Sequence, residues 1–267
     1  MRNHRATATD LTVLPVLLFL LVSAEGQSQE YVFETNDNLI TISRYVGSAE
    51  AVVIPDKING LSIDSIDGAF YHCTNVTRVI LPNGVTSIGE QSFQYCEHLT
   101  TITIPNSVTN IGAFAFSDCG MTNITLSTSL TSIEKLVFAE CINLTSITIP
   151  NSVKSIEHNA FEECINLTNV TIGSSVTNIG VMAFGKCFRL TSVIIPAVVT
   201  SIGDAAFEQC NKLTAVYFKG NAPGIGEDVF KKVPVDGTTT VYYLSGTTGW
   251  GKTFGGCPTA QWTGKLP

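Results

Sequence analysis

Cysteine recurs along this chain at an almost constant interval. Seven cysteines follow one another at steps of 23 residues, with a single step of 22 between Cys119 and Cys141. A phenylalanine stands three residues before each of them. A fixed period of this length indicates that one small structural unit is stacked on copies of itself. The repeated cysteines are Cys73, Cys96, Cys119, Cys141, Cys164, Cys187 and Cys210, and the phenylalanines are Phe70, Phe93, Phe116, Phe138, Phe161, Phe184 and Phe207.

Each unit predicts a short, regular coil. In one such unit, residues 102–104 alternate apolar and polar side chains, which predicts a strand with one buried face. Pro105 lacks the N–H that a β-ladder needs and is expected to end that strand. Residues 108–111 predict a second short strand, Gly112 a turn, and residues 115–119 one helical turn. The expected fold class is a β-rich solenoid of 23-residue coils, each contributing to a parallel β-sheet, a short second strand and a helical turn.

The repeat fades at both ends of the array, which predicts terminal caps. Val233 occupies the position at which an eighth cysteine would fall. The expected domains are a signal peptide at 1–24, an N-terminal hairpin cap at 25–49, the repeat solenoid at 50–233 and a C-terminal cap at 234–267.

The composition and the N-terminus indicate an exported protein. Charged residues make up 14% of the chain and the formal net charge is −7 without any basic run, so disorder, nucleic acid and anionic membranes are disfavoured. Arg2 and Arg5 precede an apolar segment at 11–22, which is short for a membrane span, and cleavage is expected after Ala24. An uncleaved anchor is the alternative. We expect a secreted or cell-surface monomer with no membrane insertion after cleavage.

The full repeat resembles a known family. The pattern C-x-x-L-x-x-I-x-I-P-x-x-V-x-x-I-G-x-x-A-F-x-x-C, which residues 96–119 follow, is similar to the BspA-type leucine-rich repeat, and the resemblance covers residues 50–233. It implies a leucine-rich-repeat solenoid in a surface or secreted protein, with adhesion as the associated role. The implied partners are a host or neighbouring-cell surface protein or a polysaccharide. The tail at 241–256 also resembles an ending seen after such repeats in bacterial sequences.

One motif at the C-terminal end imitates a nucleotide-binding loop. Residues 246–253 satisfy the P-loop pattern G-x-x-x-x-G-K-[ST] in full. That chemistry requires a helix after the lysine, whose N-terminal N–H groups hold the phosphates. The residues that follow, 254–258, include two glycines and a proline and do not favour a helix. We therefore expect a glycine-rich cap loop, with no cofactor and no enzymatic activity.

The cysteines have three possible roles. Zinc sites need clustered ligands such as C-x-x-C pairs, and the sequence has none, so no metal is expected. Coils stacked at roughly 4.8 Å would allow disulfides, and the secretory route favours oxidation. An inward column with parallel Cβ vectors favours free, buried thiols instead. Five N-x-[ST] sequons are either glycan acceptors or turn residues generated by the repeat, and Cys257 lies outside the column.

Outward side chains of the expected strands form a nearly uncharged face of hydroxyls and amides. Threonine suits any exposed strand face, but solenoids commonly bind partners on such broad surfaces. The sequence therefore predicts an exported, non-catalytic binding or adhesion module for a protein or glycan surface, and the alternative is a structural envelope or matrix protein without a specific ligand. The candidate binding residues are Thr101, Thr103, Asn123, Thr125, Ser146, Thr148, Asn169 and Thr171.

Overall fold

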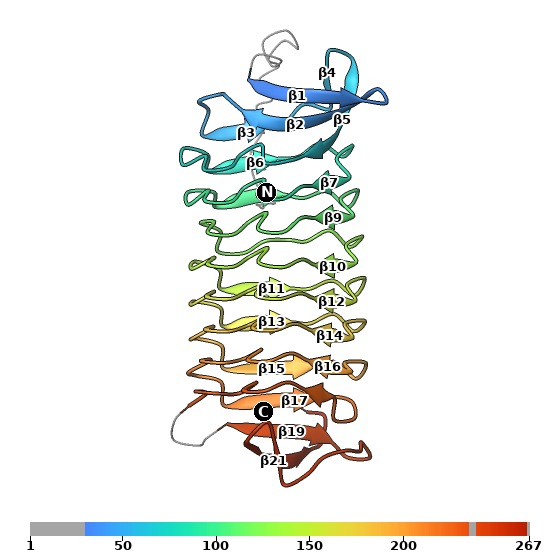
Figure 1. The fold of residues 1–267 in the computed structure, drawn as a ribbon, viewed down its shortest axis with the longest axis vertical. Coiled ribbons are helices and arrows are strands. Elements are labelled where there is room, and N and C mark those ends of the chain that lie inside the picture. The colour runs from blue at the N-terminus through green and yellow to red at the C-terminus, as the bar shows by residue number, and fades with distance from the viewer. Residues whose placement is uncertain (1–29, 235–238, 266–267) are drawn as a thin grey trace, which may run out of the picture.

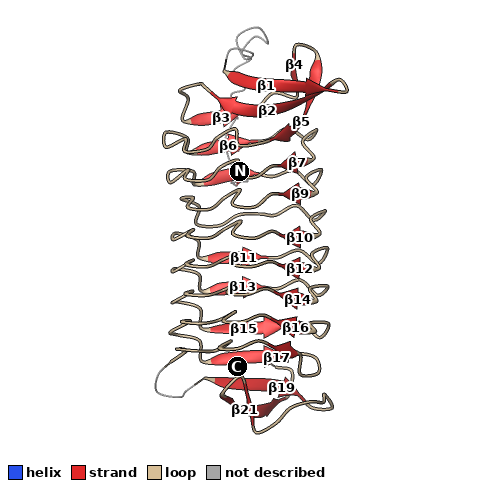
Figure 2. Ribbon diagram, viewed as in Figure 1, coloured by secondary structure: helices blue, strands red, loops and turns tan. Residues whose placement is uncertain are grey.

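The protein is an elongated stack of coils in its computed structural model, which describes residues 30–234 and 239–265 (Figure 1). Within those ranges every regular element is a β-strand and no helix is present (Figure 2). No helix there is long and apolar enough to cross a membrane. The architecture confirms the predicted β-rich solenoid of stacked coils. The predicted signal peptide, residues 1–24, lies outside the described residues.

Two sets of parallel strands run along the stack. The first set comprises β3 (Ala51–Val53), β6 (Arg78–Ile80), β8 (Thr101–Thr103), β11 (Ser146–Thr148), β13 (Asn169–Thr171), β15 (Ser192–Ile195), β17 (Ala215–Phe218), β19 (Thr240–Leu244) and β21 (Cys257–Trp262). The second set comprises β2 (Leu39–Tyr45), β5 (Leu61–Ile66), β7 (Ser87–Ile88), β9 (Asn110–Ile111), β10 (Ser132–Ile133), β12 (Ser155–Ile156), β14 (Asn178–Ile179), β16 (Ser201–Ile202) and β18 (Gly224–Ile225).

Antiparallel strands lie at both ends of the stack. At the N-terminal end, β1 (Tyr31–Asn36) forms a hairpin with β2, and β4 (Lys57–Ile58) pairs with β5. At the C-terminal end, β20 (Thr253–Phe254) pairs with β21. Figure 1 shows the β1–β2 hairpin at one end of the stack and β21 at the other.

The first set of strands is interrupted twice, which corrects the expectation of one continuous sheet. It divides into β3-β6-β8, β11-β13 and a last group that runs from β15 to β21. Between β8 and β11, residues 123–125 form no strand, and their coil is one residue shorter than the others. Between β13 and β15 no pairing is present either, and no insertion or deletion accounts for that gap.

A column of stacked phenylalanine rings forms the centre of the core. From Phe70 to Phe230 the ring centroids of successive coils lie 4.9–5.8 Å apart, and the ring planes differ by at most 19°. Tyr45 of the N-terminal hairpin continues the column at 5.1 Å from Phe70. Such offset-stacked rings stabilise beyond the area that they bury.

The cysteines form a second column, and their thiols bond to the phenylalanine column. Each thiol from Cys96 to Cys210 donates to the carbonyl of the phenylalanine in the preceding coil, at 3.0–3.3 Å. The carbonyl of Phe138, for example, accepts from both the Cys141 N–H and the Cys164 thiol. All eight cysteines of the described residues are free. Cys73 is half-buried rather than buried, which corrects the expectation for the first coil.

The segment around each phenylalanine is built from tight turns rather than the expected helical turn. The residues two before and two after the phenylalanine have positive φ, as at Asn159 (58°) and Glu163 (59°). Left-handed residues interrupt a right-handed helix. Where a glycine follows a strand of the second set, as Gly203 follows β16, it is not in the left-handed region. A Cβ at Gly203 would lie 2.6 Å from the backbone nitrogen of Val181, so close coil packing, rather than a turn, requires this glycine.

Candidate functional site

The predicted binding residues lie on one face of the first set of strands, which we call the strand face. Thr148 and Thr171 pair in register across β11 and β13, as do Ser146 and Asn169. Thr101 and Thr103 project from β8 in the same alternating pattern. All eight candidates are exposed except Ser146, which is half-buried. The structure therefore brings the candidates together, although Asn123 and Thr125 lie in the interruption between β8 and β11.

The threonines at the first set of strands fall into two groups. Those that precede the strands are structural, because the hydroxyls of Thr100, Thr145 and Thr168 donate to the threonine carbonyl of the preceding coil at 3.0–3.2 Å. The side chains of the eight candidates make no hydrogen bond to any residue in the described part of the chain, in contrast to those structural threonines. Their hydroxyls and amides are free to meet a partner.

A groove opens on the strand face where β13 and β15 fail to pair. Its polar rim includes the side chains of Asn169, Thr171 and Ser192, and its apolar part includes Ile194 and Val198. Lys219 lies beside it. No backbone hydrogen bond joins β13 to β15, so main-chain N–H and C=O groups face the opening. The sequence did not reveal this groove, because both flanking coils keep the 23-residue step.

Beyond the groove the strand face becomes apolar. Tyr217 and Tyr242 pair in register across β17 and β19, and their rings stack with centroids 5.0 Å apart. Trp262 lies 5.0 Å from Tyr217, and Ile194 packs against this cluster. This is a small hydrophobic core outside the main one. The alignment of repeats could have found most of it, since Ile194, Tyr217 and Tyr242 continue the column occupied by Thr148 and Thr171.

Charge is distributed unequally along the stack. Residues 30–185 contain five Lys and Arg against fifteen Asp and Glu, a formal net charge of −10. Residues 186–267 contain eight against five, a formal net charge of +3. The groove lies at the start of the basic part, whereas the middle of the strand face is uncharged.

Acidic residues line a different edge of the stack, at the turns beside the phenylalanine column. Burial, together with neighbouring carboxylates, raises the pKa of Asp118 and Glu140 above the usual range. The Lys186 ammonium donates to Glu163 and, at 3.0 Å, to Glu162, and these hydrogen bonds hold the pKa of Lys186 above its usual value. Among the described residues no group of three or more acidic, histidine or cysteine side chains could hold a metal ion.

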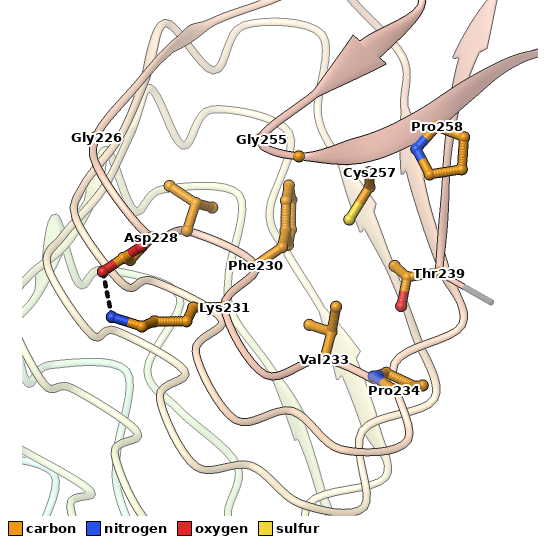
Figure 3. Close-up of a pocket in the computed structure, with 12 residues that line it drawn as sticks. Gly226, Asp228, Phe230, Lys231, Val233, Pro234, Thr239, Gly255, Cys257 and Pro258 are labelled. Atoms are coloured by element: carbon orange, nitrogen blue, oxygen red, sulfur yellow. Dashed lines mark hydrogen bonds and ion pairs between the residues drawn. The ribbon is translucent and has the colours of Figure 1, made fainter. Parts of the chain in front are cut away.

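A second hollow lies at the C-terminal end of the phenylalanine column (Figure 3). The backbone of Gly255 covers the last ring, since a Cβ there would lie 2.7 Å from Phe230. Cys257, Val233 and Thr239 complete the wall (Figure 3). The Cys257 thiol is buried, and burial raises its pKa. This hollow is an incompletely filled end of the core, where the regular cysteine is replaced by valine.

The loop with the P-loop pattern has the structure of a cap. Gly246 and Gly249 adopt positive φ, and the Trp250 indole donates to the Thr247 hydroxyl at 2.9 Å. Thr253 begins strand β20, whereas a phosphate-binding loop would lead into a helix.

Comparisons with known proteins agree with this geometry. The family model for the BspA type leucine rich repeat region matches this chain in six copies, which cover residues 65–150 and 131–248. A leucine-rich repeat protein of T. pallidum, TpLRR, is 31% identical with a TM-score of 0.57, over 78% of this chain and 90% of that chain. A leucine rich cell surface protein of Faecalibacterium prausnitzii is 28% identical with a TM-score of 0.64, over 82% and 70% respectively. None of the curated proteins matches the sequence.

Proposed function

The chain belongs to the BspA-type leucine-rich-repeat family, and from this premise we propose that it is an exported, non-catalytic binding or adhesion module that recognises a protein or glycan surface through its strand face. The observation that carries the proposal is the set of polar side chains on that face that no described residue engages. The similar Faecalibacterium prausnitzii protein is a leucine rich cell surface protein, which supports a surface location for this chain.

The physics of such a face favours many weak contacts. Each hydrogen bond to an exposed hydroxyl or amide contributes about 0.5–1.5 kcal/mol net. A partner that spans several coils can add these contributions, because the solenoid holds the side chains in fixed columns. Single substitutions should therefore weaken binding only slightly, and a change to a whole column should abolish it.

A structural role in an envelope or matrix is the second candidate. The long apolar core and the close stacking of coils would suit it equally well, and such a protein needs no specific ligand. The two functions differ in one measurable property, which is saturable binding to a defined partner.

The test is a screen of the purified protein against arrayed glycans and extracellular matrix proteins. We expect saturable binding to at least one of them, and loss of that binding when one column of the face is changed to lysine at four positions. The changed residues are Thr103, Thr125, Thr148 and Thr171.

A matched control adds the same charge elsewhere. Four exposed residues outside the strand face are changed to lysine, and this variant should bind as the parent does. The control positions are Gln91, Thr131, Asn143 and His158. Absence of any saturable partner would favour the structural role, and equal binding by the strand-face variant, still folded by circular dichroism, would place the site elsewhere.

A further inference from the structure

We propose that the groove between β13 and β15 is a subsite for an acidic saccharide, a sugar unit that carries a carboxylate, with Lys219 as the partner of that carboxylate. This inference rests on the proposed function and names the ligand chemistry of one part of the strand face.

The groove lies where the sequence departs from its own repeat. Val198 stands where other coils have a serine such as Ser107, whose hydroxyl donates to the Val85 carbonyl of the preceding coil at 2.7 Å. Val198 has no hydroxyl to donate, and it is 44% exposed. Lys219 stands where Pro196 and its equivalents end a strand. Other coils stack with the regular repeat residues at these two positions, so coil packing does not require Val198 or Lys219.

The lining of the groove fits a ligand that is both polar and apolar. Asn169, Thr171 and Ser192 offer side chains that no described residue engages, and the unpaired edges of β13 and β15 add main-chain groups. An aliphatic side chain bound here would remove these groups from water without replacing their hydrogen bonds, which is costly. A sugar ring can satisfy them with its hydroxyls while its C–H face covers Ile194 and Val198.

The charge around the groove selects an acidic sugar over a neutral or basic one. Lys219 is exposed and forms no ion pair with any described residue. Lys219 is the one charged side chain among the described residues that line the groove. A carboxylate on Lys219 would make a charge-assisted hydrogen bond, which is about twice as strong as a neutral one.

The size of the opening is also suitable. Its volume is about 480 Å³, within the range of pockets that hold small organic ligands. The groove continues into the hydroxyl columns of β11 and β13, so a longer glycan could extend along the strand face from this subsite.

Calorimetry with defined saccharides tests the proposal on the full chain. The acidic probes are sialyllactose and a galacturonic acid oligomer, and the neutral probes are lactose and maltotriose. We expect heat of binding for at least one acidic probe and none for the neutral probes. Lys219→Gln should weaken binding by about tenfold or more, and Val198→Ser, which restores the repeat residue, should weaken it several-fold.

A lysine of the same coil provides the matched control. Lys212 is exposed at the turn after Cys210 and does not line the groove, so Lys212→Gln should bind as the parent does. Equal binding of acidic and neutral probes, no effect of Lys219→Gln, or no binding of any acidic probe would each overturn the inference. The proposed function would survive these results if the array screen still finds a protein or neutral glycan partner, and both would fail if it finds none.

Discussion

Replacing one ring in the middle of the phenylalanine column should destabilise the solenoid strongly. Phe161 is fully buried, and its ring lies 5.3 Å from Phe138 and 5.2 Å from Phe184. Phe161→Ala removes the ring contacts with Phe138 and Phe184 and leaves a cavity that the rigid neighbouring coils cannot fill. Large-to-small changes of this kind cost about 3–5 kcal/mol.

The position in the column sets the magnitude. Phe230 has only one phenylalanine neighbour, at 5.8 Å, and is 4% exposed, so Phe230→Ala should cost less than Phe161→Ala by about 0.5–1.5 kcal/mol, the contribution of one aromatic pair. Phe114 lies outside the column and is half-buried, so Phe114→Ala should cost about 1 kcal/mol or less.

Urea unfolding followed by circular dichroism measures these differences as free energies of unfolding. Repeat proteins can lose cooperativity when a central interface is weakened, so Phe161→Ala should also broaden the transition. If Phe161→Ala and Phe114→Ala cost the same, the stacked column would not be the main support of the core, and the reasoning would be refuted.

Three further results are expected. Burial raises the pKa of Cys141 and Cys210 to about 12 against an ordinary value of 9.0. The thiols of the unfolded chain therefore lose their protons at a lower pH than the buried thiols do. The free energy of unfolding should fall as pH rises from about 9 toward 12, by about 1.4 kcal/mol per thiol at one pH unit above the unfolded pKa. Equal urea midpoints at about pH 8 and about pH 10 would argue against this, as would fast reaction of most native thiols with a thiol reagent. Gly203→Ala should lower the free energy of unfolding by about 1–3 kcal/mol because its Cβ meets the Val181 backbone, and a neutral effect on the urea midpoint would show that the coils can separate. Mg-ATP should give no heat of binding, and Lys252→Ala should leave the fold unchanged, since β20 follows the loop; a saturable signal that disappears in this variant would reverse the interpretation.

The period of the sequence was sufficient to predict the coils and the side chains that point inward. Phe161 and Cys164 share one face in a helical turn and also in the observed pair of turns, so their spacing alone could not distinguish the two. Asn159 and Glu163 adopt the left-handed conformation although neither is a glycine, so the sequence does not mark these turns. The sequence also could not show why position 203 requires glycine, because the requirement comes from backbone about one repeat earlier in sequence that lies adjacent in space.

The candidate face was predictable, and the groove within it was not. Alternation along single strands places Thr148 and Thr171 outward, and stacking then aligns them. Pairing between neighbouring strands depends on how the coils pack against one another. No residue pattern within 169–195 predicts that β13 and β15 do not pair. Val198 and Lys219 were nevertheless visible as departures from the repeat, which is the signal that sequence reasoning overlooked.

Hydrogen–deuterium exchange of the protein with and without its array-identified partner tests the central claim most directly. The account predicts that binding slows exchange of backbone amides in β8, β11, β13 and β15, the strands that carry the strand face and its groove. Protection confined to the acidic turn edge around Asp118 and Glu163, or to the terminal caps, would contradict it.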